Sequence, residues 1–298
     1  MIDIRPRRSV LYMPGSNARA LDKARTLAAD ALILDLEDSV APDRKEDARR
    51  QVCAAIDAGG FGPRETIVRI NALGSSWGEA DLAAVARARP DAVLVPKVRS
   101  PADLVAVGLR LRRHGAPEGT RVWAMIETPL AILDAKAIAG TALDVDTRLS
   151  CFVMGTNDLA KETKTRLVPG RAPMLPWLMG ALTAARAHGL DIIDGVYNTL
   201  SDTAGLMAEC EQARDLGFDG KSLIHPDQIT VANAIFAPTA DEIAAARAIL
   251  EAFERPENAG RAVISLDGRM VERLHADMAL RTLALATSIQ KRTDRERE

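Results

Sequence analysis

Residues 31–34, Ala31-Leu32-Ile33-Leu34, form a short run without a polar side chain. A strand that is buried on both faces has this composition, whereas a half-exposed antiparallel strand alternates apolar and polar residues. An amphipathic stretch from Arg44 to Ala58 follows the run and predicts a helix. The pair is typical of one β/α unit in a parallel sheet that is covered by helices.

The same pairing recurs along the chain. The predicted strands are Ser9–Met13, Ala31–Leu36, Thr66–Ile70, Ala92–Pro96, Arg121–Ile126, Cys151–Gly155, Asp191–Gly195 and Asp219–Ile224. The predicted helices are Asn17–Ala29, Arg44–Ala58, Gly78–Arg89, Pro101–His114, Pro129–Ala139, Leu175–His188, Asp202–Leu216 and His225–Phe236. Eight alternations predict an α/β fold of the TIM (β/α)₈ barrel type. A doubly wound open sheet is the alternative, but it usually carries a glycine-rich dinucleotide loop, which Pro14-Gly15-Ser16-Asn17 does not match.

All eight units fall within residues 1–237, which we assign to a catalytic barrel, and residues 238–298 are assigned to a C-terminal helical appendage. The appendage is expected to contain a capped helix, an apolar run, a last helix and a frayed charged tail, at Thr239–Glu254, Ala262–Leu266, Met270 to about Ile289, and Lys291–Glu298. An appendage after a complete barrel often packs on a neighbouring subunit. We therefore expect a homo-oligomer, either a trimer or a hexamer.

The composition limits the partners and the compartment. The 298 residues contain 39 basic and 41 acidic side chains, so no overall basic field favours nucleic acid or an anionic membrane as a partner. The three cysteines are far apart and have no C-x₂-C spacing, which disfavours a zinc site or a disulfide framework. The sequence contains neither a signal-type apolar core nor a membrane-length apolar run. We expect a cytoplasmic protein that does not bind membranes.

Chemistry in a barrel gathers at the carboxyl ends of the strands. The polar residues at or after those ends are Asp35, Glu37, Asp38, Arg69, Asn71, Lys97, Glu127, Asp158, Asp194 and His225. Acidic groups that face one opening repel one another unless a cation lies between them. Oxygen ligands with few histidines favour Mg²⁺ or Mn²⁺ over zinc. Any single carboxylate could instead cap a helix, but Glu127 directly follows an apolar strand and directly precedes a helix start, which favours a role in the site.

Several segments together carry a family resemblance. They are Tyr12-Met13-Pro14-Gly15-Ser16, Leu34–Val40, Val68-Arg69-Ile70-Asn71, Val95-Pro96-Lys97, Met125-Ile126-Glu127-Thr128-Pro129, Gly155-Thr156-Asn157-Asp158-Leu159, Asp191–Tyr197, Gly217–Pro226 and Asp267–Val271. In this order they resemble citrate lyase β-subunits and the malyl-CoA, β-methylmalyl-CoA and citramalyl-CoA lyases, within the wider HpcH/HpaI aldolases. The resemblance covers nearly the whole chain, although Met-Ile-Glu-Thr also suits phosphoenolpyruvate-utilising barrels.

The resemblance implies a metal-dependent site for a 3-hydroxyacyl thioester that also carries a carboxylate. Glu127 and Asp158 would hold Mg²⁺, which lowers the pKa of the substrate hydroxyl. Arg69 would meet the oxygen of the departing thioester enolate, since a guanidinium does not lose its proton. Glu37 and Asp38 would bind metal-bound waters or orient the arginine. Alternatively, Arg69 forms only an ion pair with the loop after the second strand.

The resemblance also suggests where the rest of the substrate binds. Substrate contacts are expected at Pro129, Gly155, Thr156 and Asn157. For the phosphates of coenzyme A the candidates are Arg19 and Lys23, which are four residues apart on one helix face, and the cofactor cleft could also be lined by His225 and Pro226. The alternatives are a solvated basic face for Arg19 and Lys23 and a capping or packed histidine for His225.

One position departs from the family pattern. Related lyases commonly carry an aspartate shortly after the segment that here reads Gly268-Arg269-Met270-Val271, and it serves a neighbouring subunit as an acid or base. This chain has Glu272 instead, which is one methylene longer. A shift of about 1 Å at a catalytic group can lower the rate roughly 10²-fold. Either Glu272 still serves, or the reaction moves toward thioester hydrolysis.

Three functions therefore stay open. The first is cleavage of malyl-, β-methylmalyl- or citramalyl-CoA to an acyl-CoA enolate and a 2-oxo acid. The second is the role of a citrate lyase β-subunit, which would act on a citryl thioester of an acyl-carrier protein. The third is a malyl-CoA-type thioesterase, or a weakened thioester-binding protein. Pocket shape sets the choice among such substrates, and methyl-sized differences carry only about 1–3 kcal/mol.

Overall fold

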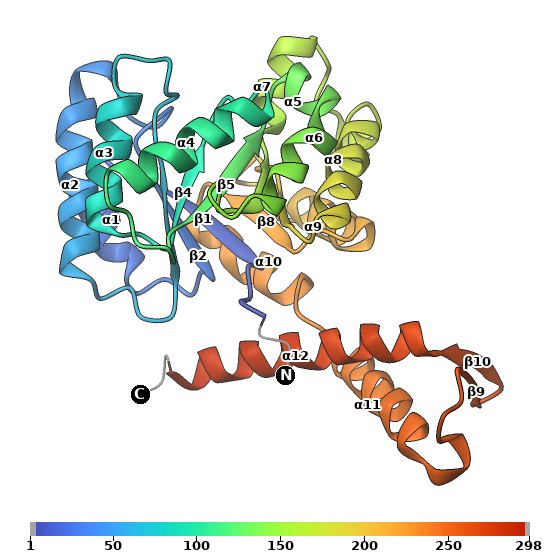
Figure 1. Cartoon of the computed structure of the whole chain (residues 1–298). Helices are drawn as coiled ribbons and strands as arrows, with labels where there is room; N and C mark the ends of the chain where they lie inside the picture. Colours follow the sequence, from blue (N-terminus) through green and yellow to red (C-terminus); the bar gives the residue numbers. More distant parts are fainter. Residues whose placement is uncertain (1–3, 296–298) are drawn as a thin grey trace. The chain divides into compact units, whose positions relative to one another are not determined.

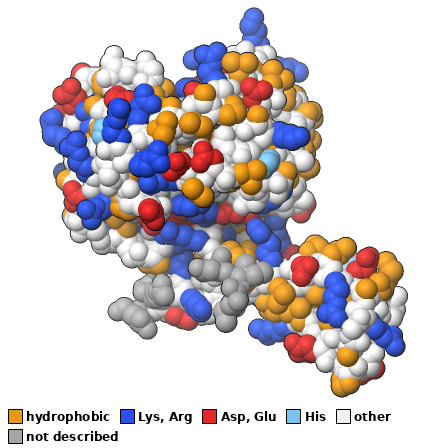
Figure 2. Space-filling model, in the orientation of Figure 1, with side chains coloured by type: hydrophobic (Ala, Val, Ile, Leu, Met, Phe, Trp, Pro, Cys, Tyr) orange, Lys and Arg blue, Asp and Glu red, His pale blue; other side chains and the backbone are white. Residues whose placement is uncertain are grey.

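The computed structural model describes residues 4–295. Within them, residues 7–234 form one compact unit, and residues 235–295 together with residues 4–6 form a second. Among the described residues, no helix combines the length and the apolarity that a membrane crossing needs. On the face shown in Figure 2, basic and acidic side chains of the barrel unit lie among apolar ones.

The first unit is a closed barrel of eight parallel strands in sequence order, and Figure 1 shows its helices around the strands. The strands are β1 (Ser9–Pro14), β2 (Ala31–Asp35), β3 (Glu65–Arg69), β4 (Ala92–Val95), β5 (Arg121–Ile126), β6 (Leu149–Met154), β7 (Asp191–Asp194) and β8 (Gly220–Leu223). Pairing of β1 with β8, with Ser9 opposite Lys221, closes the barrel. The predicted TIM barrel is confirmed.

The helices of this unit are α1 (Ala18–Ala24), α2 (Lys45–Ala58), α3 (Gly78–Ala88), α4 (Pro101–Arg113), α5 (Pro129–Leu133), α6 (Ala135–Gly140), α7 (Thr156–Thr163), α8 (Leu175–Ala187), α9 (Thr203–Leu216) and α10 (Ile229–Ile235). Two differ from the prediction. The single helix expected over Pro129–Ala139 is broken at Asp134, where the backbone leaves helical geometry at ψ 11°. Helix α7 was not among the predicted helices, and its eight residues directly follow the predicted strand Cys151–Gly155.

Side chains inside the barrel follow the two-residue period of the strands. Ile33, Ile67 and Met125 belong to the buried apolar cluster of the interior. Because alternate residues of a strand share a face, the same face continues two residues later with a polar group at the barrel mouth. Ile33 is thus followed by Asp35, and Ile67 by Arg69. The apolar interior and the site are one continuous face of the strands.

The second unit contains α11 (Ala240–Glu254), the antiparallel strands β9 (Val263–Leu266) and β10 (Arg269–Glu272), and α12 (Arg273–Arg295). Thr239 caps α11 as predicted, since its hydroxyl accepts a hydrogen bond from the backbone of Glu242. The last helix starts at Arg273 rather than Met270, because residues 269–272 pair with β9. It continues to Arg295, so the frayed tail is wrong for residues 291–295, while residues 296–298 lie outside the described residues.

Candidate active site

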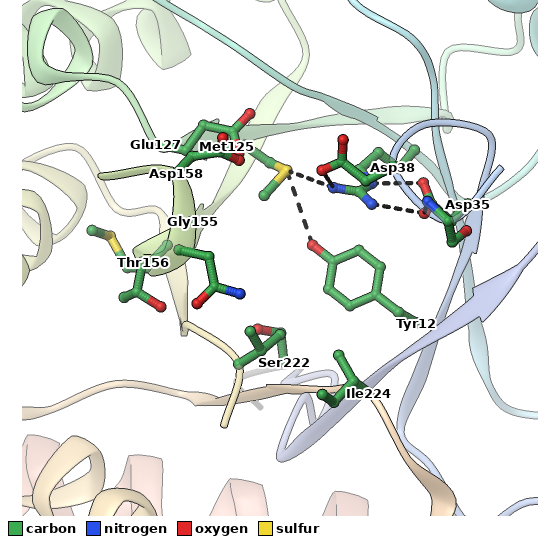
Figure 3. Close-up of a pocket in the computed structure, with 15 residues that line it drawn as sticks. Tyr12, Asp35, Asp38, Met125, Glu127, Gly155, Thr156, Asp158, Ser222 and Ile224 are labelled. Atoms are coloured by element: carbon green, nitrogen blue, oxygen red, sulfur yellow. Dashed lines mark hydrogen bonds and ion pairs between the residues drawn. The ribbon is translucent and has the colours of Figure 1, made fainter. Parts of the chain in front are cut away.

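A cavity of about 320 Å³ lies at the carboxyl ends of the strands (Figure 3). This volume is within the range of small-molecule sites. Its lining comes from β1, β2, β3, β5, β6 and β8 and from residues that follow these strands or β7: Tyr12, Asp35, Asp38, Ser39, Arg69, Met125, Glu127, Met154, Gly155, Thr156, Asn157, Asp158, Val196, Ser222 and Ile224. The cavity therefore contains most of the predicted chemistry.

Arg69 is buried and fixed by a two-pronged contact with Asp35. Its Nε and Nη2 donate to the two carboxylate oxygens of Asp35 at 2.6 and 2.7 Å. The guanidinium also lies over the ring of Tyr12, 4.8 Å from the ring centre. Burial acts to raise the pKa of Asp35, but the Arg69 charge leaves that pKa below its usual value. The ion pair with the loop that was expected as the alternative exists, and it leaves Nη1 as the nitrogen that is not bound to Asp35.

Nη1 of Arg69 faces the carboxylates that follow β2. It lies 2.8 Å from Oε2 of Glu37 and 3.5 Å from Oδ2 of Asp38. The contact with Glu37 is close but poorly aligned, so the buried Oε2 atom of Glu37 has no hydrogen-bond partner among the described residues. Burial raises the pKa of Glu37 to about 7 in spite of Arg69. Asp38 is the more exposed of the two and lines the cavity.

Glu127 comes to the mouth two residues after the inward-facing Met125, and it is fully buried. Its Oε1 accepts a hydrogen bond of 2.6 Å from the backbone of Lys97, whereas its Oε2 has no hydrogen-bond partner among the described residues. Burial raises the pKa of Glu127 to about 8. Gly155 leaves the space that this carboxylate occupies, since a Cβ there would lie 2.7 Å from Oε2.

Lys97 lies between Glu127 and Asp158. Its Nζ is 2.6 Å from Oδ2 of Asp158 and 3.5 Å from Oε2 of Glu127, and its backbone has a positive φ of 54°. Burial acts to raise the pKa of Asp158, but the hydrogen bond with Lys97 leaves it below its usual value. Two carboxylates from neighbouring strands thus surround one cation. The sequence identified Lys97 as a strand-end residue without assigning it this place.

This donor set fits a hard divalent cation. Mg²⁺ is commonly held by one or two carboxylates, with waters or substrate as its other ligands. Glu127 and Asp158 supply two carboxylates, and Oε2 of Glu127 is a buried oxygen without a hydrogen-bond donor. Within residues 4–295 no cluster of three or more acidic, histidine or cysteine side chains could hold a metal. Any ion here would take its remaining ligands from water or substrate.

Asp194 was expected at the mouth of the barrel, but its side chain lies on the outer, helix-facing side of the strands. Ile193 faces the barrel interior, so Asp194 points outward toward α9, where both its oxygens accept from Arg171 at 2.8 Å. Lys221 lies 2.7 Å from Asp194 and 3.0 Å from Glu209. We call Arg171, Asp194, Glu209 and Lys221 the charged network. Asn71 is also structural, since its side chain bonds the backbone of Leu36 and the carboxylate of Asp81.

The other predicted residues divide into two groups. Gly155, Thr156 and Asn157 line the cavity, whereas Pro129 does not and forms the first residue of α5. His225 caps a short helical turn that begins at Pro226, since its Nδ1 accepts from the backbone of Asp227. The capping alternative therefore describes His225 in this structure.

The candidates for phosphate binding and for acid–base chemistry lie on accessible elements. Arg19 and Lys23 are both exposed on α1, which follows β1. Glu272 ends β10 in the second unit and is partly exposed, and its backbone amide donates to Nδ1 of His275.

Sequence reasoning gave no role to Tyr12 and Met125, although both line the cavity. Tyr12 lies two residues after the buried Val10 on β1, and Met125 two residues after the buried Trp123 on β5. The two-residue period was the signal that could have placed both side chains at the mouth.

Comparison with known proteins places the chain in a family. The HpcH/HpaI aldolase/citrate lyase model matches residues 8–226, and a model of carbon–carbon bond lyases with the TIM-barrel fold matches residues 172–288. A (3S)-malyl-CoA thioesterase of Cereibacter sphaeroides is 51% identical over 95% of this chain and 96% of its own length. Citrate lyase subunit beta of Escherichia coli is 38% identical over 95% of this chain and 94% of its own.

A solved structure agrees with these matches. CitE of Mycobacterium tuberculosis, in complex with magnesium, acetoacetate and coenzyme A, is 30% identical and has a TM-score of 0.75, covering 95% of this chain and 98% of that one. The family matches run through the strands that build the cavity. The chain therefore belongs to the HpcH/HpaI aldolase/citrate lyase family of enzymes.

Proposed function

We propose that this protein hydrolyses the thioester of a short 3-hydroxyacyl-CoA that carries a free carboxylate, with malyl-CoA as the first candidate. The observation that carries the proposal is one cavity with a fixed guanidinium, Arg69, and a carboxylate pair, Glu127 and Asp158, in which a buried oxygen lacks a hydrogen-bond donor. The 51% identity to a (3S)-malyl-CoA thioesterase favours this substrate and this outcome.

Glu127 and Asp158 are the proposed ligands of Mg²⁺, or of Mn²⁺. When bound there, the metal would chelate the carboxylate and hydroxyl of the substrate and hold the acyl group in one orientation. Magnesium in the solved CitE complex supports this assignment. Gly155, Thr156 and Asn157 would form the wall beside the acyl group, because they line the same cavity.

Arg69 stabilises the negative charge that develops on the thioester carbonyl oxygen. In hydrolysis, water attacks the carbonyl carbon, the carbon–sulfur bond breaks, and the thiolate of coenzyme A leaves and takes up a proton. Asp38 lines the cavity and is the proposed acceptor of the water proton. Glu37 packs against Nη1 of Arg69 and orients it. A fixed cation at an oxygen of this kind stabilises the transition state more than the ground state.

The exposed side chains of Arg19 and Lys23 on α1 are the proposed contacts for the phosphates of coenzyme A. The cofactor would extend from the mouth past Ile224, with His225 and Pro226 beside it. Coenzyme A in the CitE complex supports a cofactor of this kind. A carrier-protein thioester is the alternative handle, which the similarity to citrate lyase subunit beta supports.

Glu272 is proposed to act as an acid or base for a neighbouring subunit of a homo-oligomer, a trimer or a hexamer. Apolar side chains of the second unit support an association surface, since Met270, Leu274 and Met278 are each more than half exposed. Figure 2 shows such apolar side chains on this unit. Mixed oligomers of Glu272→Ala and Arg69→Ala subunits, each inactive alone, should regain activity. Verified mixed oligomers that stay inactive would contradict this role.

Carbon–carbon cleavage is the second candidate, because both family models are those of lyases and citrate lyase subunit beta is 38% identical. Cleavage of malyl-CoA would give an acyl-CoA enolate and a 2-oxo acid. The negative charge would develop on the same thioester oxygen, so Arg69 has the same task in both reactions.

One screen separates the two reactions. Malyl-, β-methylmalyl-, citramalyl- and citryl-CoA are each incubated with enzyme and Mg²⁺, and free thiol and keto product are followed in parallel. Hydrolysis releases thiol without a keto product, whereas cleavage releases the keto product without thiol. Absence of both products from all four thioesters, while a citryl-carrier thioester is turned over, would replace the proposal with the citrate lyase role. Absence of turnover throughout would overturn it.

A further inference from the structure

Two hydrogen-bond donors in the cavity share one poor acceptor. The hydroxyl of Tyr12 lies 3.9 Å from Sδ of Met125, and Nη1 of Arg69 lies 3.8 Å from the same sulfur. Figure 3 shows the sulfur with a dashed line to each donor. A thioether sulfur accepts only weakly. The Tyr12 hydroxyl and the charged Nη1 of Arg69 thus both point to the same sulfur, and neither finds an oxygen acceptor of the described residues at that position.

Within residues 4–295, the hydroxyl of Tyr12 has Sδ of Met125 as its acceptor and no oxygen or nitrogen acceptor, and the residue lines the cavity. Tyr12 is only partly buried, so an acceptor on a bound ligand can reach its hydroxyl. Burial raises the pKa of Tyr12 far above its usual value, and the nearby Asp35 and Glu127 act in the same direction against Arg69. Tyr12 therefore keeps its proton at neutral pH and can donate it in a hydrogen bond.

Contacts with the barrel interior and with Asp35 fix the positions of Tyr12 and Arg69. The ring of Tyr12 packs against the interior cluster of the barrel and lies on the guanidinium of Arg69. Asp35 holds the other two nitrogens of that guanidinium, and Nη1, which also contacts Glu37 and Asp38, faces the sulfur. Met125 is unbranched with three rotatable side-chain bonds, so its sulfur can withdraw when a ligand enters.

We propose that the Tyr12 hydroxyl and Nη1 of Arg69 together bind the thioester carbonyl oxygen of the substrate, beside the sulfur of Met125, and that Tyr12 is a catalytic residue. The inference rests on the proposed function, since it names the second donor for the same oxygen. The carbonyl oxygen gains negative charge in hydrolysis and in cleavage alike. A donor pair that is already oriented strengthens as this charge develops.

The test is Tyr12→Phe, which removes the hydroxyl and keeps the ring over Arg69. The matched control is Tyr197→Phe, because the chain has two tyrosines and the hydroxyl of Tyr197 bonds Asp202 outside this cavity. Loss of one oxyanion donor lowers kcat about 10²–10³-fold, and we expect this from Tyr12→Phe with little change in KM. Tyr197→Phe should keep the wild-type kcat.

A second measurement separates donation from packing. A thioether analogue of malyl-CoA, which lacks the carbonyl oxygen, should inhibit wild type and Tyr12→Phe with the same constant. Wild-type kcat in Tyr12→Phe would overturn the inference, and so would a loss of analogue binding as large as the loss in kcat. If wild type turns over no thioester, the proposed function fails first, and that result is visible before the variant is assayed.

Discussion

Two groups of buried charges lie at the carboxyl ends of the barrel strands, and they are built in opposite ways. In the charged network, Asp194 accepts from Arg171 at 2.8 Å and from Lys221 at 2.7 Å, and Lys221 also bonds Glu209. In the cavity, one oxygen of Glu127 and one of Glu37 have no hydrogen-bond donor among the described residues.

The pKa values of the buried carboxylates Asp194 and Glu127 differ because their cationic partners differ, although both side chains are equally buried. Burial acts to raise the pKa of Asp194, but Lys221 and Arg171 leave that pKa below its usual value. The equally buried Glu127 has its pKa raised to about 8, since Lys97 offsets only part of the burial. Compensated charges join α9 to the barrel wall, whereas incompletely compensated carboxylates at the mouth are suited to receive a cation. The degree of compensation therefore distinguishes the charges that stabilise the fold from the charges that line the candidate site.

The largest effect on activity is expected from substitution of the incompletely compensated carboxylates in the cavity. Glu127→Ala and Asp158→Ala should each abolish metal-dependent turnover, because either change removes half of the proposed protein ligands. Circular dichroism should show an intact fold, and titration calorimetry should show loss of Mg²⁺ binding. Full activity of either variant in the presence of a chelator would contradict the metal assignment.

In the charged network the expected loss is in stability. Lys221→Met leaves Asp194 and Glu209 without their shared ammonium, and removing one partner of a buried pair costs about 3–5 kcal/mol. Urea denaturation measures this free energy of unfolding. Lys23→Met, on the exposed face of α1, is the control and should stay within about 0.5 kcal/mol of wild type. A loss below about 1 kcal/mol for Lys221→Met would contradict a stabilising role of the charged network.

Exchange of arginine for lysine probes both groups with one chemical change. Arg69→Lys should lower kcat about 10²-fold or more, because a point charge replaces a planar fork at a developing oxyanion. Arg171→Lys should instead lower the melting temperature and leave kcat close to wild type. Steady-state kinetics and thermal denaturation of both variants test the contrast, and equal kcat losses would remove it.

The smallest effect is a pH dependence. The pKa of Glu37 rises from 4.5 to about 7 on folding, so its contribution to stability is present below pH 4.5 and is lost as pH rises through about 7. Relative to Glu37→Gln, wild type should therefore lose up to about 3 kcal/mol between pH 4 and pH 8. Asp194, whose pKa is lowered, should show the opposite sign on acidification. Denaturation at a series of pH values measures both, and a flat difference for Glu37 would contradict the raised pKa.

The fold could be predicted from sequence because eight apolar runs and eight amphipathic stretches follow two different periods. Arg69, Glu127 and Asp158 were placed at the mouth by the same argument. Asp194 was placed wrongly, because proximity to a strand end does not say which face a side chain takes. Only the pairing that puts Ile193 inside shows that Asp194 points outward.

Other misses have equally local causes. The start of α12 was placed at Met270, since the pairing of β10 with β9 depends on contacts that a helical pattern does not show. Tyr12 was named only as part of a family segment. A role for its hydroxyl depends on the neighbouring Met125 and Arg69, which only the folded structure shows.

The contact between Arg69 and Asp35 also has a consequence for binding. A free arginine side chain carries about 2 kcal/mol of rotamer entropy, which is lost whenever the guanidinium is held in one place. Here two hydrogen bonds and the ring of Tyr12 already hold it in the folded protein. The ordering cost is therefore met during folding and not when the ligand arrives. Asp35 would thus contribute to affinity by having immobilised Arg69 beforehand.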